Sequence, residues 1–217
     1  PKYFKVLKTD LTLKSRIKLS YILPPIDSSS NFLCETVANL DKNISFVTHS
    51  QGGAVVNHAQ SICPDLKVER IIYLASVSPL MGEKPFDKLS KEDENNYFKG
   101  VSYEENSGLM VISNKDKFVE TFSSKENSPL KKFILSSAVH EPAYIADGVV
   151  KMNTEKFSDI KKFYIFTQQD QIISLASQKK IEEPLKTVET RSINSGHIPM
   201  ITHADHLVKI LVDFLVI

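Results

Sequence analysis

The chain has 217 residues, 41% of them hydrophobic and 24% charged, which is typical of one globular α/β or α+β domain with a sizeable core. It carries 27 Lys and Arg against 26 Asp and Glu, and this near balance favours neither nucleic acid nor an anionic membrane as a partner. The two cysteines, Cys34 and Cys63, are too few for a disulfide framework or a four-ligand zinc site, so we expect a reducing, cytoplasmic compartment. No apolar run reaches the ~20 residues that a membrane span requires.

The opening of the chain predicts one strand and one helix. The chain begins at Pro1 without a methionine or a signal-peptide pattern, so we expect a processed or truncated product. Residues 3–15 are loosely amphipathic, and residues 17–23 are typical of a strand that two prolines end. The Asp-Ser-Ser-Ser-Asn run at residues 27–31 offers N-cap chemistry for a helix over residues 32–40.

Strands and helices then alternate. Short β-branched or apolar runs predict strands, and the segments between them predict helices. The expected elements are a strand over residues 44–48, a turn at 49–53, a helix over 54–62 and a strand over 68–76. After a long interruption they continue with a strand over residues 163–167, a helix over 175–181, a strand over 187–193 and a helix over 204–216.

The interruption, at about residues 79–158, is polar and rich in Pro, Asn and Lys. We expect helices over residues 115–121 and 129–138, and we interpret the whole segment as a cap insertion. Its Lys-rich segments, residues 84–99 and 115–132, are interleaved with acids, as solvated surfaces are.

Strands separated by helices predict a mostly parallel sheet with helices on both faces, because right-handed crossovers require that cover. The sequence shows no internal repeat and no long Gly/Ser linker. We therefore expect one α/β domain over residues 1–217, with the cap inserted in its middle.

Ser50 stands between a predicted buried strand and a predicted helix, with Gly52 and Gly53 directly after it. A nucleophile elbow requires this context, in which a sharp turn presents the serine and small neighbours let strand and helix approach. Thr48 replaces the first glycine of the G-x-S-x-G pattern. The pentapeptide alone therefore also fits an ordinary turn that happens to contain a serine.

A serine hydroxyl needs a base to remove its proton, and the base needs a third group that fixes its tautomer. Asp170 follows the strand predicted over residues 163–167, and His197 follows the strand predicted over 187–193. In a parallel sheet, these residues and Ser50 would all lie at the carboxyl ends of strands, where such folds build their sites. The chain order Ser, Asp, His is that of α/β-hydrolases.

At this point the chain resembles the α/β-hydrolase superfamily, and within it the compact esterases related to plant methylesterases and hydroxynitrile lyases. The resemblance covers nearly the whole chain, loosely through the cap. It is carried by Phe46-Val-Thr-His-Ser-Gln-Gly-Gly53, Ile71-Ile-Tyr-Leu-Ala-Ser76, Phe163-Tyr-Ile-Phe-Thr-Gln-Gln-Asp-Gln-Ile172 with Gln178, and Gly196-His-Ile-Pro-Met-Ile-Thr202.

The resemblance implies a role for each matching residue. Ser50 would be the nucleophile, His197 the general base and Asp170 the acid that orients it. The backbone N–H of Gln51 would be one oxyanion donor. Met200 stands where the lyase branch carries a lysine near its histidine, which favours ester hydrolysis over lyase chemistry.

One departure concerns the start of the chain. Relatives begin with a strand and a His-Gly type loop that supplies the second oxyanion N–H, whereas here the first recognisable elements resemble those after that loop. Losing one oxyanion donor typically costs ~10²–10³ in rate, and losing a central strand exposes sheet edges. With the opening strand missing, we expect either a fragment or an unusual role for residues 1–15. An impaired or inactive protein stays an open alternative.

Other histidines have simpler explanations than catalysis or metal binding. We expect the His49 side chain to lie on the opposite side of the elbow from the nucleophile, in a buried structural role. His203 and His206 flank Asp205 and could be drawn as metal ligands. Thr202 and Asp205 fit better as a capping-box-like start of the last helix.

The remaining candidates are weaker still. His58 and His140 have no acidic or cysteine partner at ligand spacing, and neither Asp147 nor Asp159 closely follows a strand as an alternative acid should. Without a Gly-rich phosphate loop, a nucleotide cofactor has no support. Several side chains could line an acyl or alcohol pocket beneath the cap: Tyr73, Tyr97, Phe98, Tyr103, Met110, Phe118 and Phe122.

These residues predict a serine hydrolase that needs no cofactor and no metal, and that acts as a carboxylesterase on a small or medium ester. The acyl-enzyme would form on Ser50, and water activated by His197 would resolve it. Two alternatives stay open, a lyase that uses the same triad and a non-catalytic relative that binds a ligand. The sequence does not predict an oligomeric state.

Overall fold

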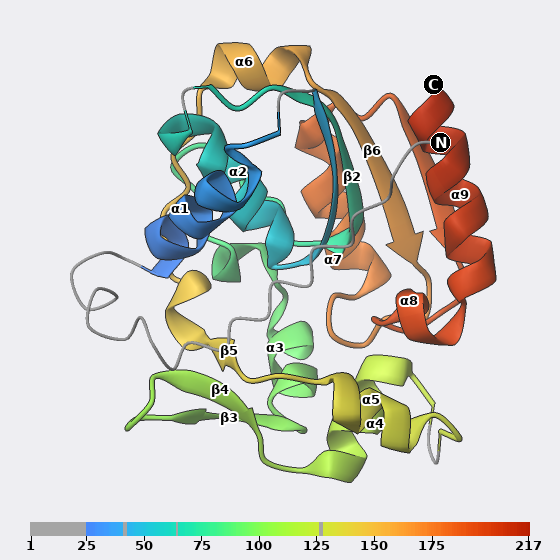
Figure 1. The fold of residues 1–217 in the computed structure, drawn as a ribbon. Helices are drawn as coiled ribbons and strands as arrows, with labels where there is room; N and C mark the ends of the chain where they lie inside the picture. Colours follow the sequence, from blue (N-terminus) through green and yellow to red (C-terminus); the bar gives the residue numbers. More distant parts are fainter. Residues whose placement is uncertain (1–24, 41–42, 64, 126–127) are drawn as a thin grey trace.

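The computed structural model describes residues 25–40, 43–63, 65–125 and 128–217. Figure 1 shows a twisted central sheet flanked by helices, with a second layer below it. The central sheet has the strand order β1-β2-β6-β7, and each neighbouring pair is parallel. The expected α/β fold with a mostly parallel sheet is therefore confirmed.

The elements of the central layer follow the expected order. Its strands are β1 (Ile44–Ser50), β2 (Val68–Ser76), β6 (Lys161–Thr167) and β7 (Glu189–Ile193). Its helices are α1 (Pro25–Val37), α2 (Gly52–Ile62), α6 (Thr154–Asp159), α7 (Leu175–Glu182), α8 (Pro199–Thr202) and α9 (Ala204–Val216), with a 3-10 turn at Glu183–Leu185.

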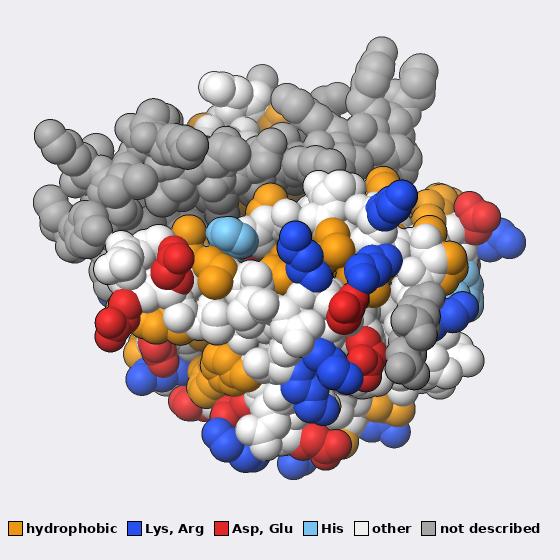
Figure 2. Space-filling model, turned by 90° about the horizontal axis from the view of Figure 1, so that it is seen from below, with side chains coloured by type: hydrophobic (Ala, Val, Ile, Leu, Met, Phe, Trp, Pro, Cys, Tyr) orange, Lys and Arg blue, Asp and Glu red, His pale blue; other side chains and the backbone are white. Residues whose placement is uncertain are grey.

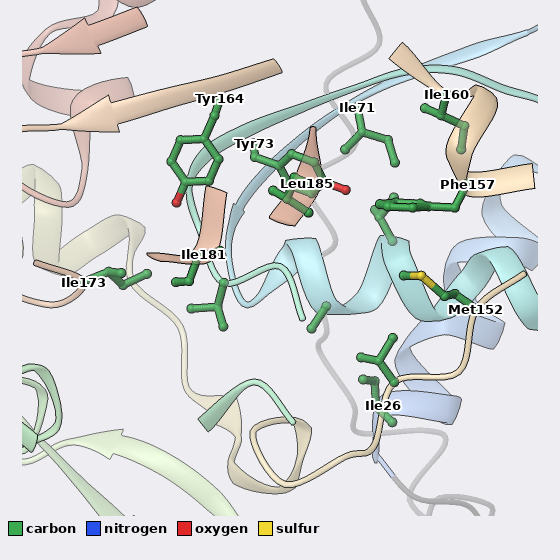
Figure 3. Close-up of a cluster of buried hydrophobic side chains, with 14 of the residues drawn as sticks. Ile26, Ile71, Tyr73, Met152, Phe157, Ile160, Tyr164, Ile173, Ile181 and Leu185 are labelled. Atoms are coloured by element: carbon green, nitrogen blue, oxygen red, sulfur yellow. The ribbon is translucent and has the colours of Figure 1, made fainter. Parts of the chain in front are cut away.

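Strand β2 is buried on both faces of the sheet over residues 71–76, and its successive side chains alternate between the two faces. Ile71 and Tyr73 belong to a cluster that includes side chains of α1, α2 and α7, whereas Ile72 and Leu74 pack with α9. Figure 3 shows the first cluster, in which Tyr164 of β6 lies near Tyr73. Burial on both faces explains why the strand is a continuous apolar run in the sequence.

Between β2 and β6 the chain builds a second layer, the lower layer (residues 86–145), at the carboxyl ends of the central strands (Figure 1). The helices expected at residues 115–121 and 129–138 are present, whereas a small antiparallel sheet of order β3-β4-β5 was not expected. The layer contains α3 (Lys91–Tyr97), β3 (Val101–Glu104), β4 (Leu109–Ile112), α4 (Lys115–Ser123), α5 (Lys131–Ser137) and β5 (Glu141–Pro142), with 3-10 turns at Phe86–Lys88 and Ala143–Ile145.

The surface of the lower layer carries charges of both signs. Figure 2 looks at this layer from below and shows Lys and Arg side chains interspersed with Asp and Glu. Lys91 pairs with Glu94, and Lys117 pairs with Glu120, each three residues apart on a helix. This is the pattern expected of a solvated face.

Helix α1 begins earlier than expected, since the predicted start was residue 32 and the observed one is Pro25. Proline is well suited to a first helical position, because its missing N–H has no partner there anyway. Ser30 lies inside the helix, where its hydroxyl donates to the Val55 carbonyl oxygen of α2 at 3.0 Å. Contacts with α2 therefore outweigh the weak helix propensity of the serine run.

A disulfide joins Cys34 of α1 to Cys63 at the end of α2, with 5.7 Å between their Cα atoms. Such bonds persist in oxidising compartments and are rare in reducing ones. The disulfide thus argues against the reducing compartment that the low cysteine count suggested.

The predictions for residues 3–15 and 17–23, and the expected absence of an opening strand, lie outside the described residues. Within the described ranges, no helix is long and apolar enough to cross a membrane.

Candidate active site

Ser50 is the last residue of β1, and its φ of 52° lies in the left-handed region. That conformation is strained for a residue with a side chain and recurs at functional sites. The Ser50 carbonyl oxygen accepts two hydrogen bonds of 2.9 Å, from the Val77 backbone N–H and from the Ser76 hydroxyl. The end of β2 therefore holds the sharp turn that the sequence predicted here.

The residues around this turn show why it needs small neighbours. A Cβ on Gly53 would lie 2.6 Å from Ser78 Oγ and 2.8 Å from the Val77 carbonyl oxygen, whereas one on Gly52 would meet its nearest neighbour, Thr48 Cβ, at 3.8 Å. Close approach thus requires glycine at position 53. Thr48, the departure from the motif, is buried and donates to Ser76 Oγ at 3.2 Å.

Asp170 lies in the loop after β6 and is almost fully buried. Its Oδ1 accepts the backbone N–H groups of Ile172 at 2.8 Å and Ile173 at 2.9 Å, and its Oδ2 accepts the Thr167 hydroxyl at 2.8 Å. Burial alone would raise the pKa of Asp170, but the neighbouring His197 and these hydrogen bonds outweigh burial, so the pKa is lowered. Asp170 is therefore ionised at neutral pH.

His197 follows β7, and its side chain is 1% exposed. Its Nδ1 lies 2.8 Å from Asp170 Oδ2. An ionised carboxylate can only accept, so Nδ1 carries the proton, and the lone pair of Nε2 is left available as a base. The structure thus brings together two of the three residues that the sequence singled out, in the tautomer that general-base chemistry requires.

Gln178 of α7 fixes the loop that carries Asp170. Its amide nitrogen donates to the carbonyl oxygens of Thr167 at 3.0 Å and Ile173 at 2.7 Å, and its amide oxygen accepts the Thr167 N–H at 3.0 Å. All of these groups are buried. A fully satisfied buried network of this kind rigidifies the segment that it joins.

The expected orientation of His49 is wrong. Its side chain does not lie away from the site: Nε2 is 2.7 Å from the backbone oxygen of His197, and the two imidazole rings are 4.5 Å apart. The pairing of β1 with β2 shifts register between His49 and Ser50, so simple strand alternation does not decide which way this side chain points. The elbow and the His197 loop are therefore in direct contact.

Two features of the elbow bear on its reactivity. No described residue forms a hydrogen bond with Ser50 Oγ, although such bonds are often long without substrate and tighten when it binds. Gln51, expected to donate its backbone N–H, is the N-cap residue of α2. Backbone N–H groups at a helix start have no partner within the helix and are suited to bind negative charge.

The lower layer reaches His197 through aromatic and aliphatic side chains. The Phe122 ring of α4 meets the His197 ring edge to face at 5.6 Å. Tyr97, Met110 and Phe122 pack against a hydrophobic cluster that includes Ile198. These belong to the set expected to line a pocket, whereas Tyr73 of that set lies in the central core and donates to Asn57.

Glu141 belongs to no sequence motif that would indicate a role at the site. This residue pairs with Met110 across β4 and β5, so both side chains lie on the sheet face that packs toward Ile198. Burial of its carboxyl group raises the pKa of Glu141, while the nearby His197 acts to lower it. The residue as a whole keeps an exposed surface, so its carboxyl group lies at the edge of the protein and interacts electrostatically with His197.

The remaining histidines stay apart from this site. His203 and His206 are exposed, and among the described residues no group of three His, Cys, Asp or Glu side chains could hold a metal ion. The expected capping box is wrong, because Thr202 lies in α8 and donates to the Ile198 carbonyl oxygen, and His203 is the N-cap of α9. His58 instead contacts Asp27 of α1.

The alternative acids and one cavity of the described residues also lie elsewhere. The carboxylate bonded to His197 is that of Asp170, and no contact joins Asp147 or Asp159 to that histidine within the described ranges. A cavity of about 460 Å³, lined by Asp159, Lys161 and Val188 among others, lies at the amino ends of β6 and β7. It is therefore at the opposite end of the sheet from Asp170 and His197.

No protein-family model and no curated protein matches the sequence. Among solved structures, a pyrethroid hydrolase from Sphingobium faniae JZ-2 matches with a TM-score of 0.72 at 17% identity, over 89% of this chain and 79% of that chain. Polyneuridine aldehyde esterase matches with a TM-score of 0.68 at 19% identity, over 85% and 77%. An extracellular α/β-hydrolase from a Paenibacillus species matches with a TM-score of 0.65 at 17% identity, over 87% and 78%. The chain thus has the α/β-hydrolase fold, as its sequence predicted.

Proposed function

We propose that this protein is a serine hydrolase, and within that class a carboxylesterase that acts on a small or medium ester. The observation that carries the proposal is the buried hydrogen bond between Asp170 and His197, beside an elbow that holds Ser50 at positive φ. The matching solved structures include proteins described as a pyrethroid hydrolase and polyneuridine aldehyde esterase, which supports the same chemistry.

In the proposed reaction, Ser50 Oγ attacks the ester carbonyl carbon while His197 Nε2 takes the hydroxyl proton. Asp170 stabilises the imidazolium that forms. The backbone N–H of Gln51 donates to the negatively charged carbonyl oxygen. As the tetrahedral intermediate collapses, His197 gives its proton to the leaving alcohol. A water molecule that His197 deprotonates then attacks the acyl carbon, and the acid leaves as His197 returns this proton to Ser50 Oγ.

We also assign a covering role to the inserted segment. Residues 79–158 are proposed to act as a cap within a single domain of residues 1–217. The contact between Phe122 and His197 supports this role, because it brings the lower layer over the base. An ester would then be held between the elbow and the side chains of Tyr97 and Met110.

The first experiment compares hydrolysis of a short p-nitrophenyl ester by the wild type and by Ser50→Ala. The wild type should release p-nitrophenol, and the variant should not. His206→Ala, a change at an exposed histidine, serves as the matched control and should keep full activity. Equal activity in wild type and Ser50→Ala would mean that the activity comes from a contaminant or from another residue.

Covalent labelling separates the proposal from its alternatives. A fluorophosphonate should label the wild type at Ser50 and leave His197→Ala unlabelled, because the serine reacts only when a base activates it. A protein that neither labels nor hydrolyses esters would contradict the proposal and leave a ligand-binding relative or an impaired protein as the alternatives. Product analysis with a cyanohydrin identifies a lyase, since cleavage would release a carbonyl compound and cyanide.

A further inference from the structure

Among the described residues, one hydrogen bond joins the elbow (residues 49–53) to the loop after β7 (residues 194–198). It runs between His49 Nε2 and the His197 carbonyl oxygen, at 2.7 Å. These two segments come from the outer strands of the described sheet, since its order is β1-β2-β6-β7. Two intervening strands therefore separate the strand of the proposed nucleophile from the strand that precedes the proposed base. This hydrogen bond joins the segments at the carboxyl ends of those two outer strands.

The acceptor in this contact determines which ring nitrogen of His49 carries a hydrogen. A carbonyl oxygen only accepts, so Nε2 must carry a hydrogen and donate it. Burial, followed by repulsion from His197, lowers the pKa of His49 from 6.5 to about 3. His49 is therefore a neutral donor at neutral pH and adds no positive charge beside the imidazolium that His197 becomes.

We infer that His49 is a positioning residue: its Nε2–H holds the backbone of His197 so that the imidazole of that residue faces Ser50. The inference rests on the proposed function, in which Ser50 and His197 exchange a proton. The tilted packing of the His49 and His197 rings, at 45° between planes, adds a second restraint on the same group. His49 acts through His197 and is assigned no contact with substrate.

Geometric control of this kind has a measurable consequence for the rate. Displacing a reacting group by about 1 Å can cost on the order of 10²-fold in rate. Nucleophile attack depends on the alignment of His197, whereas binding of the ester to the surrounding pocket does not. The loss should therefore appear in kcat and leave KM nearly unchanged.

The test compares His49→Leu with His49→Gln. Leucine removes the donor, and we expect kcat to fall by about 10²-fold at similar KM. The glutamine amide nitrogen reaches about as far as Nε2 and can donate to the same carbonyl, so it should recover at least about tenfold of that loss. His206→Leu is the control for replacing a histidine by leucine. A leucine variant with wild-type kcat, or a glutamine variant no better than leucine, would overturn the inference.

A second readout needs no turnover. In a Ser50→Ala background, the proton on His197 Nδ1 should give a strongly deshielded NMR resonance, because it is held by the buried Asp170 carboxylate. We expect this signal to persist with His49→Gln and to broaden or vanish with His49→Leu, as the loop loosens. Should the leucine variant not fold, His49→Asn takes its place, because its shorter amide does not reach the carbonyl.

The two readouts separate the two ideas. If the resonance responds as expected but no variant hydrolyses any ester, the proposed function fails and the positioning role stands. If esters are hydrolysed but substitution of His49 changes neither the resonance nor kcat, the positioning role fails and the proposed function stands.

Discussion

Asp170 uses one carboxylate oxygen for two backbone N–H groups and the other for Thr167 and His197. An asparagine could keep much of this packing. Its NH₂ group, however, would compete to donate to Nδ1 and would favour the tautomer in which Nε2 carries the proton. A single uncharged substitution therefore tests whether the tautomer of His197 matters.

We predict that Asp170→Asn lowers kcat for ester hydrolysis by about 10⁴-fold with little change in KM. Steady-state kinetics with a p-nitrophenyl ester measures the effect, and a thermal melt checks that the variant folds. A folded variant that keeps kcat within about tenfold of wild type would show that this carboxylate does not govern the base.

His49 makes a prediction about stability and pH. Its pKa of about 3 in the folded protein lies below the unfolded value of 6.5, so between these pH values the unfolded chain binds a proton that the folded protein does not. Stability is therefore fully present above pH 6.5 and falls as the solution becomes more acidic, by up to about 1.4 kcal/mol per pH unit.

The measurement is the free energy of urea unfolding between pH 4 and pH 7 for the wild type and His49→Gln. The wild type should lose stability more steeply, because glutamine does not titrate. Protonation of Asp170 also destabilises the fold in acid, because its lowered pKa means that the folded state favours the ionised carboxylate. This loss of stability is the same in both proteins. Parallel curves for the two proteins would refute the shift assigned to His49.

At the level of secondary-structure elements, the junction of β1, α2 and β2 depends on one glycine more than on its neighbour. Gly53→Ala would push a methyl group into Ser78 and the Val77 carbonyl, whereas Gly52→Ala has room. We predict a loss of about 1–3 kcal/mol for Gly53→Ala. Gly52→Ala should be neutral or stabilising by up to about 1 kcal/mol.

Chemical denaturation of both variants checks this difference, and ester hydrolysis reports whether the elbow has moved. Gly53→Ala should also lose activity, because the clash lies one turn from Ser50. The interpretation would be wrong if both alanines destabilised the protein equally.

Strand β5 is only two residues long, yet it carries the carboxyl group of Glu141 close to His197. Under the proposed function, a negative charge there favours esters that carry a positive charge over neutral ones. We predict that Glu141→Gln lowers kcat/KM severalfold for an ester of a quaternary ammonium alcohol and leaves kcat/KM for a neutral ester of similar size unchanged. An equal effect on both esters would place Glu141 outside substrate recognition.

Across the whole molecule, the central elements were predictable and the lower layer was not. The strand at residues 68–76 was predicted with the observed bounds, because its burial on both faces leaves an unbroken apolar run. Strands β3, β4 and β5 are only partly buried and very short, so their periodicity is too weak to detect. The capping box of α3, Ser90 with Asp93, is a feature of this layer with a local sequence signal for the start of a helix.

The site shows the same division. The contact between Asp170 and His197 follows from strand order, which the alternation of elements reveals. The contact of His49 with His197 depends on a register shift at the end of β1, and the position of Glu141 depends on a two-residue strand pairing. Neither has a local sequence pattern, because both arise only when distant segments pack.

The disulfide is a restraint on the molecule as a whole, since it closes a loop between residues 29 apart. In the chain-entropy account, such a loop is worth roughly 3.5 kcal/mol of stability. We predict that the double variant Cys34→Ala with Cys63→Ala loses about that much in urea unfolding, and that dithiothreitol destabilises the wild type but not the variant. A wild type insensitive to reduction would mean that the bond does not stabilise the folded state.

The two histidines in contact at the site are 148 residues apart in the sequence. Contacts over such a separation form late, after the loops between them have been ordered. Under the proposed function, a chain released before β7 is complete could form the β1 turn but would have no base beside it. Labelling of Ser50 by a fluorophosphonate should therefore report the last step of folding. During refolding, the rate of labelling should rise with the last phase, when the segments after β1 and β7 come into contact.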